Sequence, residues 1–158
     1  MQDLRECLEK LDCVDVATYI QSGNAVFRHT GPAKALAESI TDAVESGFGF
    51  RPAAMLLTGA AFADIVAANP YLVDSNDPKH VYTWFLGSSA TAADSGRLKA
   101  IALEDEQFVL TDAAFYLFAP LGVGRSKLAS EVEKRLGVPT TARNSRTVGK
   151  ISELLSQL

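Results

Sequence analysis

Two short stretches near the end of the chain combine glycine, hydroxyl and basic side chains in a pattern suited to anions. The first runs Gly122-Val123-Gly124-Arg125-Ser126-Lys127-Leu128, and the second runs Thr140-Thr141-Ala142-Arg143-Asn144-Ser145-Arg146-Thr147-Val148. Each precedes a predicted helix, and the start of a helix offers free N–H groups and a positive dipole end. We therefore expect an anion-binding site in which the two helix starts face a common opening. Its predicted residues are Arg125, Ser126, Lys127, Arg143, Asn144 and Thr147.

The same residues also have a purely structural interpretation. Ser126 can cap the first of these helices, and Asn144 or Ser145 can cap the second. The glycine spacing does not match a phosphate loop, which needs four residues between its first glycine and Gly-Lys-Ser/Thr. Both interpretations remain open at this level.

Charge supports a local anion site in an otherwise acidic protein. Residues 123–158 contain seven basic and three acidic side chains, while the whole chain has a net charge of −4. An acidic body argues against general coating of nucleic acid, whereas a basic end suits one phosphorylated small molecule or a nucleic-acid segment.

Two other functions stay open. One is an enzyme of unknown class that acts on an anionic substrate, with Ser126 beside Lys127 or Arg143. The other is a protein-interaction module that uses its sheet surfaces.

Other chemistry finds little support. His29 and His80 lack the spacing of metal ligands, so we expect no metal and no cofactor. Cys7 and Cys13 match neither a zinc motif nor a redox pair, and Cys7 is predicted to be a buried thiol on the first helix. These cysteines, and the absence of a bilayer-length apolar run or a signal-peptide pattern, indicate a cytoplasmic protein. The segment Gln21-Ser22-Gly23-Asn24 is interpreted as a hairpin turn.

Hydrophobic periodicity divides the chain into two similar series of elements. The first half predicts a helix over 2–11, strands over 14–20 and 24–28, a helix that opens at Gly31-Pro32 and closes at Gly47, and a strand over 52–58. The second half predicts helices over 60–68, 92–103, 126–136 and from about Val148, with strands over 80–86, 107–110, 114–118 and 139–142.

The second half therefore reads β-α-β-β-α-β, and the first half reads α-β-β-α-β. This order predicts an α+β fold of two ferredoxin-like (α/β-plait) domains, the first without its opening strand. The domains are expected at 1–58 and 59–158, with the break near Thr58–Gly59 or at 74–78. The predicted core comprises Leu4, Leu8, Leu11, Leu36, Ile40, Val44, Leu128, Val132, Ile151 and Leu155.

The missing strand has a consequence for stability. In a plait the first strand lies in the middle of the sheet, so the strands at 24–28 and 52–58 would lack their shared neighbour. We expect a chain that is weakly stable or that self-associates through exposed strands.

Three blocks of sequence resemble the bacterial domain-of-unknown-function family 1697. They are the residues from Thr18 to Phe27, the glycine stretch from Gly122 to Leu128, and Thr141-Ala142-Arg143-Asn144 followed by Thr147-Val148. The resemblance implies two ferredoxin-like domains and no established activity. It also implies an opening strand that this chain lacks. Where that family tends to have Trp and Asn after the Arg-Asn pair, this chain has Ser145 and Arg146.

Overall fold

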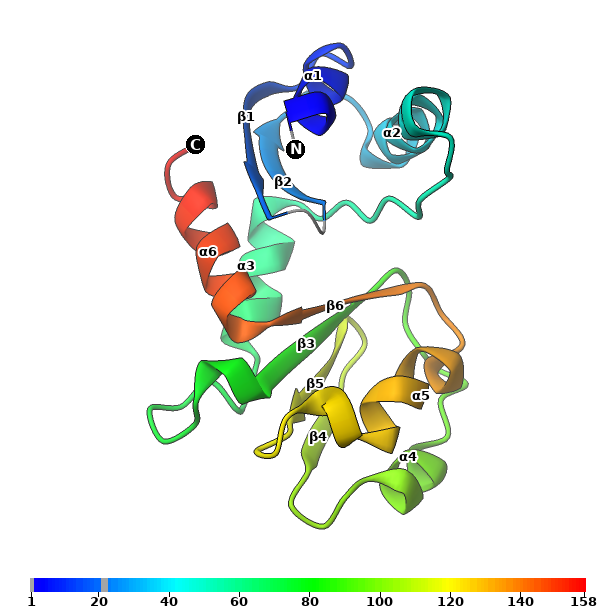
Figure 1. Cartoon of the computed structure of the whole chain (residues 1–158), viewed down its shortest axis with the longest axis vertical. Coiled ribbons are helices and arrows are strands. Elements are labelled where there is room, and N and C mark those ends of the chain that lie inside the picture. Colours follow the sequence, from blue (N-terminus) through cyan, green and yellow to red (C-terminus); the bar gives the residue numbers. More distant parts are fainter. Residues whose placement is uncertain (1, 21–22) are drawn as a thin grey trace. The chain divides into compact units, whose positions relative to one another are not determined.

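The computed structural model describes residues 2–20 and 23–158, which form two compact units. Unit 1 contains residues 1–62 and 149–158, and unit 2 contains residues 63–148. The described residues form six α-helices and two antiparallel sheets, which confirms the α+β class (Figure 1).

Unit 1 is built on one β-hairpin and two helices. Its elements are α1 (Gln2–Glu9), β1 (Val14–Tyr19), β2 (Asn24–Arg28) and α2 (Ala33–Phe48), followed by the first residues of α3 (Gly59–Ala67). β1 and β2 pair antiparallel, with Ala17 opposite Val26. Apolar residues four apart on α2 bury one face of that helix. The buried cluster comprises Leu8, Cys13, Val16, Leu36, Ile40 and Val44.

Two predictions for this unit are wrong. Residues 52–58 form no strand, because among the described residues no neighbouring strand pairs with them. Gly47 does not close α2. The helix continues to Phe48, and Gly49 ends it with a left-handed φ of 74°, where its N–H donates to the carbonyl of Glu45. A helix needs a residue that tolerates positive φ at this position, and Gly47 and Gly49 satisfy that requirement equally well.

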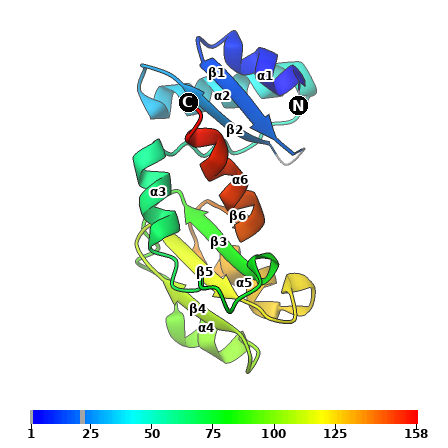
Figure 2. The ribbon, with the colours of Figure 1, turned by 90° about the vertical axis from the view of Figure 1, so that its left-hand side faces the viewer.

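Unit 2 is a four-stranded antiparallel sheet covered by helices (Figure 2). The strand order is β4-β5-β3-β6, so β3 has a neighbour on each side. Thr83 of β3 lies opposite Tyr116 of β5 and opposite Arg143 of β6. Its elements are the 3-10 turn η1 (Pro78–His80), β3 (Val81–Leu86), α4 (Ser95–Ile101), β4 (Gln107–Leu110), β5 (Ala114–Phe118), the 3-10 turn η2 (Val123–Arg125), α5 (Lys127–Leu136), β6 (Thr140–Asn144) and the start of α6 (Ser145–Leu155).

The two faces of this sheet carry different side chains, because successive residues of a strand point to opposite faces. One face bears Trp84 and packs against α4 and α5. Its cluster of ten buried residues is Trp84, Leu86, Ala90, Leu98, Phe115, Leu117, Ala119, Leu128, Val132 and Leu136. The other face bears Thr83 and Tyr116. Tyr116 donates from its hydroxyl to the carbonyl of Ile65 at 2.8 Å, and Asn69 Nδ2 donates to the hydroxyl of Thr83 at 3.2 Å.

The remaining differences from prediction are local. α4 covers 95–101 rather than 92–103, because Asp94 caps it by accepting the N–H of Arg97. β6 ends at Asn144 rather than Ala142. Six predicted core residues are buried: Leu8, Leu36, Ile40, Val44, Leu128 and Val132. The other four, Leu4, Leu11, Ile151 and Leu155, are only half-buried. Leu4 lies near the start of the chain, Leu11 follows the end of α1, and Ile151 and Leu155 belong to α6, the last helix.

Candidate functional site

The start of α5 is a well-formed helix cap. The chain enters it through Gly122, whose φ is 79°, and then through the turn η2. Ser126 is buried, and its hydroxyl accepts the N–H of Ala129 at 2.9 Å. This bond confirms the structural interpretation of Ser126 and uses one of the free N–H groups of the first turn.

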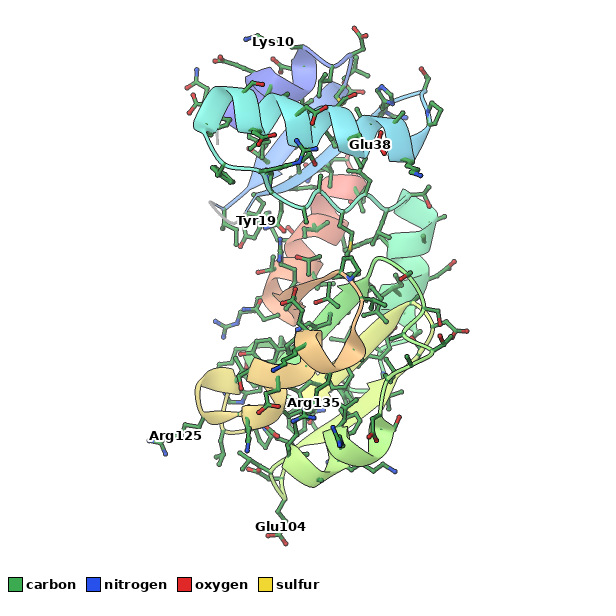
Figure 3. All side chains as sticks on the ribbon, turned by 90° about the vertical axis from the view of Figure 1, so that its right-hand side faces the viewer. Lys10, Tyr19, Glu38, Glu104, Arg125 and Arg135 are labelled. Atoms are coloured by element: carbon green, nitrogen blue, oxygen red, sulfur yellow. The ribbon has the colours of Figure 1, made fainter. Side chains whose placement is uncertain are left out.

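Two exposed cations flank that cap. Arg125 and Lys127 lie on either side of Ser126, and neither forms a salt bridge within the part of the chain that the structure describes. Figure 3 shows the Arg125 side chain directed away from the ribbon of its unit. A Cβ placed on Gly124 would contact no atom within 4 Å, so the backbone here is open. Leu121, just before the glycines, is 73% exposed. The loop 121–127 is therefore an open basic surface.

The start of α6 is capped in a similar way. Asn144 Oδ1 accepts the N–H of Thr147 at 2.9 Å, and the hydroxyl of Ser145 donates to the carbonyl of Val81 at 3.1 Å. Ser145 and Thr147 are buried. Of the two predicted caps, Asn144 is the residue that caps α6, while Ser145 forms a hydrogen bond between this helix and β3.

Arg143 is half-buried within β6. Its Nη1 donates to the hydroxyl of Thr141 and to the carbonyl of Ala142, both at 2.7 Å. Loss of water around the guanidinium lowers the pKa of Arg143 from its usual value, although the side chain stays charged at neutral pH.

The sheet separates the predicted site residues. Arg143 lies opposite Thr83, and cross-strand partners share a face, so its side chain lies on the Thr83 face. α5 covers the other face, because Leu128 belongs to the Trp84 cluster. The structure thus groups Arg125, Ser126 and Lys127 at the start of α5, and places Arg143 across the sheet. Alternate residues of a strand share a face, so a predicted strand that included both Thr141 and Arg143 would have placed them together. That pattern could have indicated from the sequence that Arg143 is separated from the start of α5.

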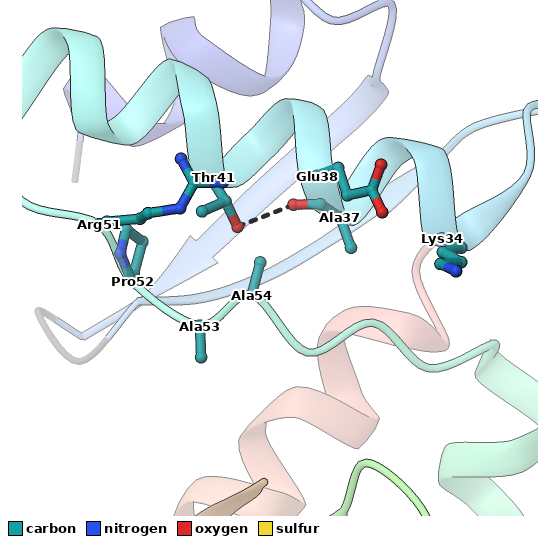
Figure 4. A pocket seen from close by; sticks show the side chains of 8 residues that line it. All are labelled: Lys34, Ala37, Glu38, Thr41, Arg51, Pro52, Ala53 and Ala54. Carbon is teal, nitrogen blue, oxygen red and sulfur yellow. Dashed lines mark hydrogen bonds between the residues drawn. The ribbon is translucent and has the colours of Figure 1, made fainter.

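Unit 1 contains a hollow that the sequence analysis missed. It has a volume of about 440 Å³ and lies between α2 and the segment that follows it (Figure 4). Arg51 at its rim donates to Asp42 at 2.8 Å and also to Glu45. Both hydrogen bonds raise the pKa of Arg51, and the bond to Glu45 has the larger effect. The lining residues are Lys34, Ala37, Glu38, Thr41, Arg51, Pro52, Ala53 and Ala54.

The other sequence candidates take ordinary places. His29 Nδ1 accepts the N–H of Gly31 at 2.9 Å, and Asn24 Nδ2 donates to the carbonyl of Tyr19 at 3.1 Å. Gln21 and Ser22 lie outside the described residues. Cys13 is buried, but Cys7 is half-buried, which corrects the prediction for that thiol. Burial raises the pKa of the Cys13 thiol, and the nearby charges of Asp12 and Cys7 add to that effect.

Within residues 2–20 and 23–158, no three His, Cys, Asp or Glu side chains are grouped closely enough to hold a metal ion. None of the helices in these ranges has the length and apolar character needed to cross a membrane.

Comparison with solved structures identifies a similar fold in a bacterial protein. The structure of conserved bacterial protein SP0830 from Streptococcus pneumoniae superposes with a TM-score of 0.65 at 24% identity. The match covers 98% of this chain and 88% of that protein. At this identity the likeness establishes the fold alone. No curated protein matches the sequence.

Comparison with protein families gives a more specific result. The model of a family described as "Protein of unknown function (DUF1697)" matches residues 1–116, which is well over half of the chain. The matched region includes the first of the three resembling blocks, while the two basic blocks lie beyond it. The chain therefore belongs to the DUF1697 family of proteins of unknown function.

Proposed function

We propose that the protein is a non-enzymatic binding protein that holds a phosphorylated small molecule at the loop 121–127. The observation that carries the proposal is the pair of exposed side chains, Arg125 and Lys127, on either side of the buried cap Ser126. A phosphate group beside this loop would accept charge-assisted hydrogen bonds from both cations. The positive end of the α5 dipole would add to that attraction.

The proposed site is smaller than the sequence pattern suggested. Arg125, Ser126 and Lys127 remain its centre, with Ser126 holding the helix start in place rather than touching the ligand. Arg143, Asn144 and Thr147 are bonded within their own segment or to its neighbours. Arg143 therefore serves as the comparison residue in the test below.

Two alternatives predict different behaviour. A nucleic-acid segment would contact several phosphates, and its affinity would fall steeply with salt. An enzyme acting on an anionic substrate would need a base beside its nucleophile. Ser126 instead accepts a backbone N–H from Ala129, and that bond supports a binding protein over a catalytic one.

The test is calorimetric titration with inorganic phosphate, a nucleoside monophosphate, a sugar phosphate and a short oligonucleotide. We expect saturable binding of a phosphate monoester. In the double variant Arg125→Ala/Lys127→Ala, the affinity for that phosphate monoester should fall at least tenfold. Lys134→Ala, which removes an exposed cation from the other end of α5, is the matched control and should bind normally.

Three outcomes would count against this function. Absence of binding by all four probes would leave the loop as a protein-docking surface. Equal losses in the double variant and in Lys134→Ala would show nonspecific charge attraction. A loss in Arg143→Ala as large as that in the double variant would restore the larger, two-helix site.

The proposal extends to the fold and the compartment. We infer that both units are ferredoxin-like domains, and the strand order β4-β5-β3-β6 with the chain order β-α-β-β-α-β in unit 2 supports this. The proposed domains 1–58 and 59–158 differ from the compact units mainly in the last ten residues, which group with unit 1. The two free cysteines support the cytoplasm as the compartment.

A further inference from the structure

The turn that joins α1 to β1 lies between the two cysteines of the chain, because Cys7 belongs to α1 and Cys13 directly precedes β1. This turn has the hydrogen bonds of a Schellman motif. The N–H of Cys13 donates to the carbonyl of Leu8 at 3.1 Å, and the N–H of Asp12 donates to the carbonyl of Glu9 at 3.2 Å. Asp12 has the left-handed φ that the motif requires, at 60°. The turn therefore folds the start of β1 back onto the last turns of α1.

The same turn brings the two cysteines together. In a Schellman motif, the residue after the left-handed position contacts the side chains that precede the last turn, and here these belong to Leu8 and Cys7. The packing agrees, since Cys13 is a buried member of the unit 1 cluster and Cys7 packs against that cluster. Sequence spacing alone does not show this pairing, because it depends on the left-handed conformation of Asp12.

The two thiols lie in different surroundings. Cys7 is half-buried, so small solutes can reach it, whereas Cys13 is 3% exposed. Burial is the main cause that raises the pKa of the Cys13 thiol, followed by the charges of Asp12 and then Cys7, which also indicates that the two sulfurs are close. The Cys13 Sγ donates a weak hydrogen bond to the carbonyl of Leu11 at 3.9 Å. Because the thiolate is the reactive form, an oxidant should react first with Cys7 and not with Cys13.

We propose that Cys7 and Cys13 form an oxidation site, at which a hydroperoxide such as hydrogen peroxide converts the two thiols into a disulfide. The Cys7 thiolate attacks a peroxide oxygen, the O–O bond breaks, and a sulfenic acid and one water form after proton transfer. The Cys13 sulfur then loses its proton and attacks the Cys7 sulfur, the S–O bond breaks, and a second water leaves. In sum, two thiols lose two electrons and two protons, and one hydrogen peroxide becomes two waters. This site is independent of the phosphate site in unit 2.

Two other reactions of the Cys7 sulfenic acid compete with this step. One is a disulfide with Cys7 of a second copy, and the other is further oxidation to a sulfinic acid. Both need a second molecule to collide with Cys7, whereas Cys13 is already beside it in the folded chain. A neighbouring group held in this way has a high effective concentration, so the internal disulfide should form first.

The first test treats the full chain with equimolar hydrogen peroxide and maps the products after alkylation and trypsin digestion. Trypsin cleaves after Arg5, Lys10 and Arg28, so the disulfide would join peptide 6–10 to peptide 11–28. We expect this joined pair as the main product, and dithiothreitol should separate it. In Cys13→Ala, the reaction should stop at a sulfenic acid on Cys7 that dimedone captures. A Cys7–Cys7 dimer or a sulfinic acid as the main product of the parent chain would overturn the proposal, as would the absence of reaction.

The second test asks whether the folded turn, rather than short spacing in the chain, brings the sulfurs together. Equilibration with reduced and oxidised glutathione gives the effective concentration of one thiol at the other, and we expect it to be at least tenfold higher in buffer than in urea. Asp12→Val disfavours the left-handed φ and should lower the value in buffer at least fivefold. Asp12→Asn removes the same charge but tolerates that φ, so it is the matched control and should keep the parent value. Equal values in buffer and in urea, or equal values in the two variants, would overturn the proposal.

Discussion

Unit 1 and unit 2 contain the same succession of helices and hairpins, yet they bury very different cores. Unit 2 encloses a cluster of ten buried residues on one face of a four-stranded sheet, whereas unit 1 encloses six beside a single hairpin. Large apolar side chains such as Val14 and Phe50 remain exposed in unit 1. The difference is one strand, because β3 supplies buried residues to both faces of its sheet and bonds to two neighbours.

In unit 1, the packing of helices on a hairpin is enough to fix local structure, but it leaves the sheet incomplete. α2 is long and amphipathic, its C-terminal end is capped by Gly49, and it buries Leu36, Ile40 and Val44 without a central strand. The segment 52–57 is extended and apolar, but it cannot become a strand without a bonded neighbour. Pairing, rather than local preference, decides its state.

Leucine truncation should show the largest difference between the units. Leu128→Ala should cost about 2–5 kcal/mol, because Leu128 is fully buried in the larger cluster. Leu36→Ala should cost about 2 kcal/mol, the lower end of that range, because the smaller cluster can relax around the lost methyl groups. Urea unfolding followed by circular dichroism measures both.

Trp84, the only tryptophan of the chain, makes this comparison specific. It is buried in the unit 2 cluster and contacts Phe115 edge to face, so its fluorescence reports on unit 2. Leu128→Ala should shift the fluorescence transition, and Leu36→Ala should shift mainly the dichroism. Equal shifts of both signals in both variants would show that the two units unfold as one.

The next largest effect should come from Tyr116, which ties the sheet of unit 2 to α3. Tyr116→Phe leaves the Ile65 carbonyl without its buried donor and should cost about 1–3 kcal/mol. Tyr71→Phe is the control, because within the described residues the Tyr71 hydroxyl has no hydrogen-bond partner while its ring stacks on Phe118. A cost for Tyr71→Phe as large as that for Tyr116→Phe would refute the role of the hydroxyl bond.

Loss of the α5 cap should have a smaller effect. Ser126→Ala removes the bond to the Ala129 N–H and should cost about 0.5–2 kcal/mol. Ser130→Ala, which removes an exposed hydroxyl on the same helix, should have almost no effect on the free energy of unfolding. If the two variants lost the same stability, the capping role of Ser126 would be wrong.

Asp77 should give the smallest effect, and one that depends on pH. Its carboxylate accepts the Lys79 N–H and pairs with the Lys79 side chain, and these contacts lower the pKa of Asp77. A lowered folded-state pKa adds stability above the unfolded value near about 4, and that contribution is lost as the pH falls through the folded value. Asp77→Asn should therefore be slightly less stable at pH 7 and equal to the parent near pH 2. A stability difference that grew on acidification would contradict this sign.

Much of the fold could be predicted because local signals and pairing agree in unit 2. The bounds of β4 and β5 match the predicted strands, since Thr111 and Asp112 mark a tight turn between two apolar runs. The failures arise where two residues could serve equally, as with Gly47 and Gly49, or where a long-range partner decides, as in 52–58. Neither kind of choice is visible in hydrophobic periodicity.

The candidate site could be predicted only in part for a similar reason. Sequence placed caps at both helix starts, and the structure confirms Ser126 and Asn144 in those roles. The expected grouping with Arg143 depended on strand register, because one residue of register decides which face a side chain occupies. The hollow beside α2 left no signal, since alanine and proline dominate the segment that lines it.

Native-state hydrogen exchange tests most directly the claim that unit 1 has open strand edges where unit 2 has a central strand. Amides of β3 should exchange slowly, because β3 bonds to β5 and β6. Amides of residues 53–57 should exchange near the rate of an unfolded chain at the same pH and temperature. Slow exchange of 53–57, comparable with that of β3, would show that this segment already has a bonded partner and would contradict the account.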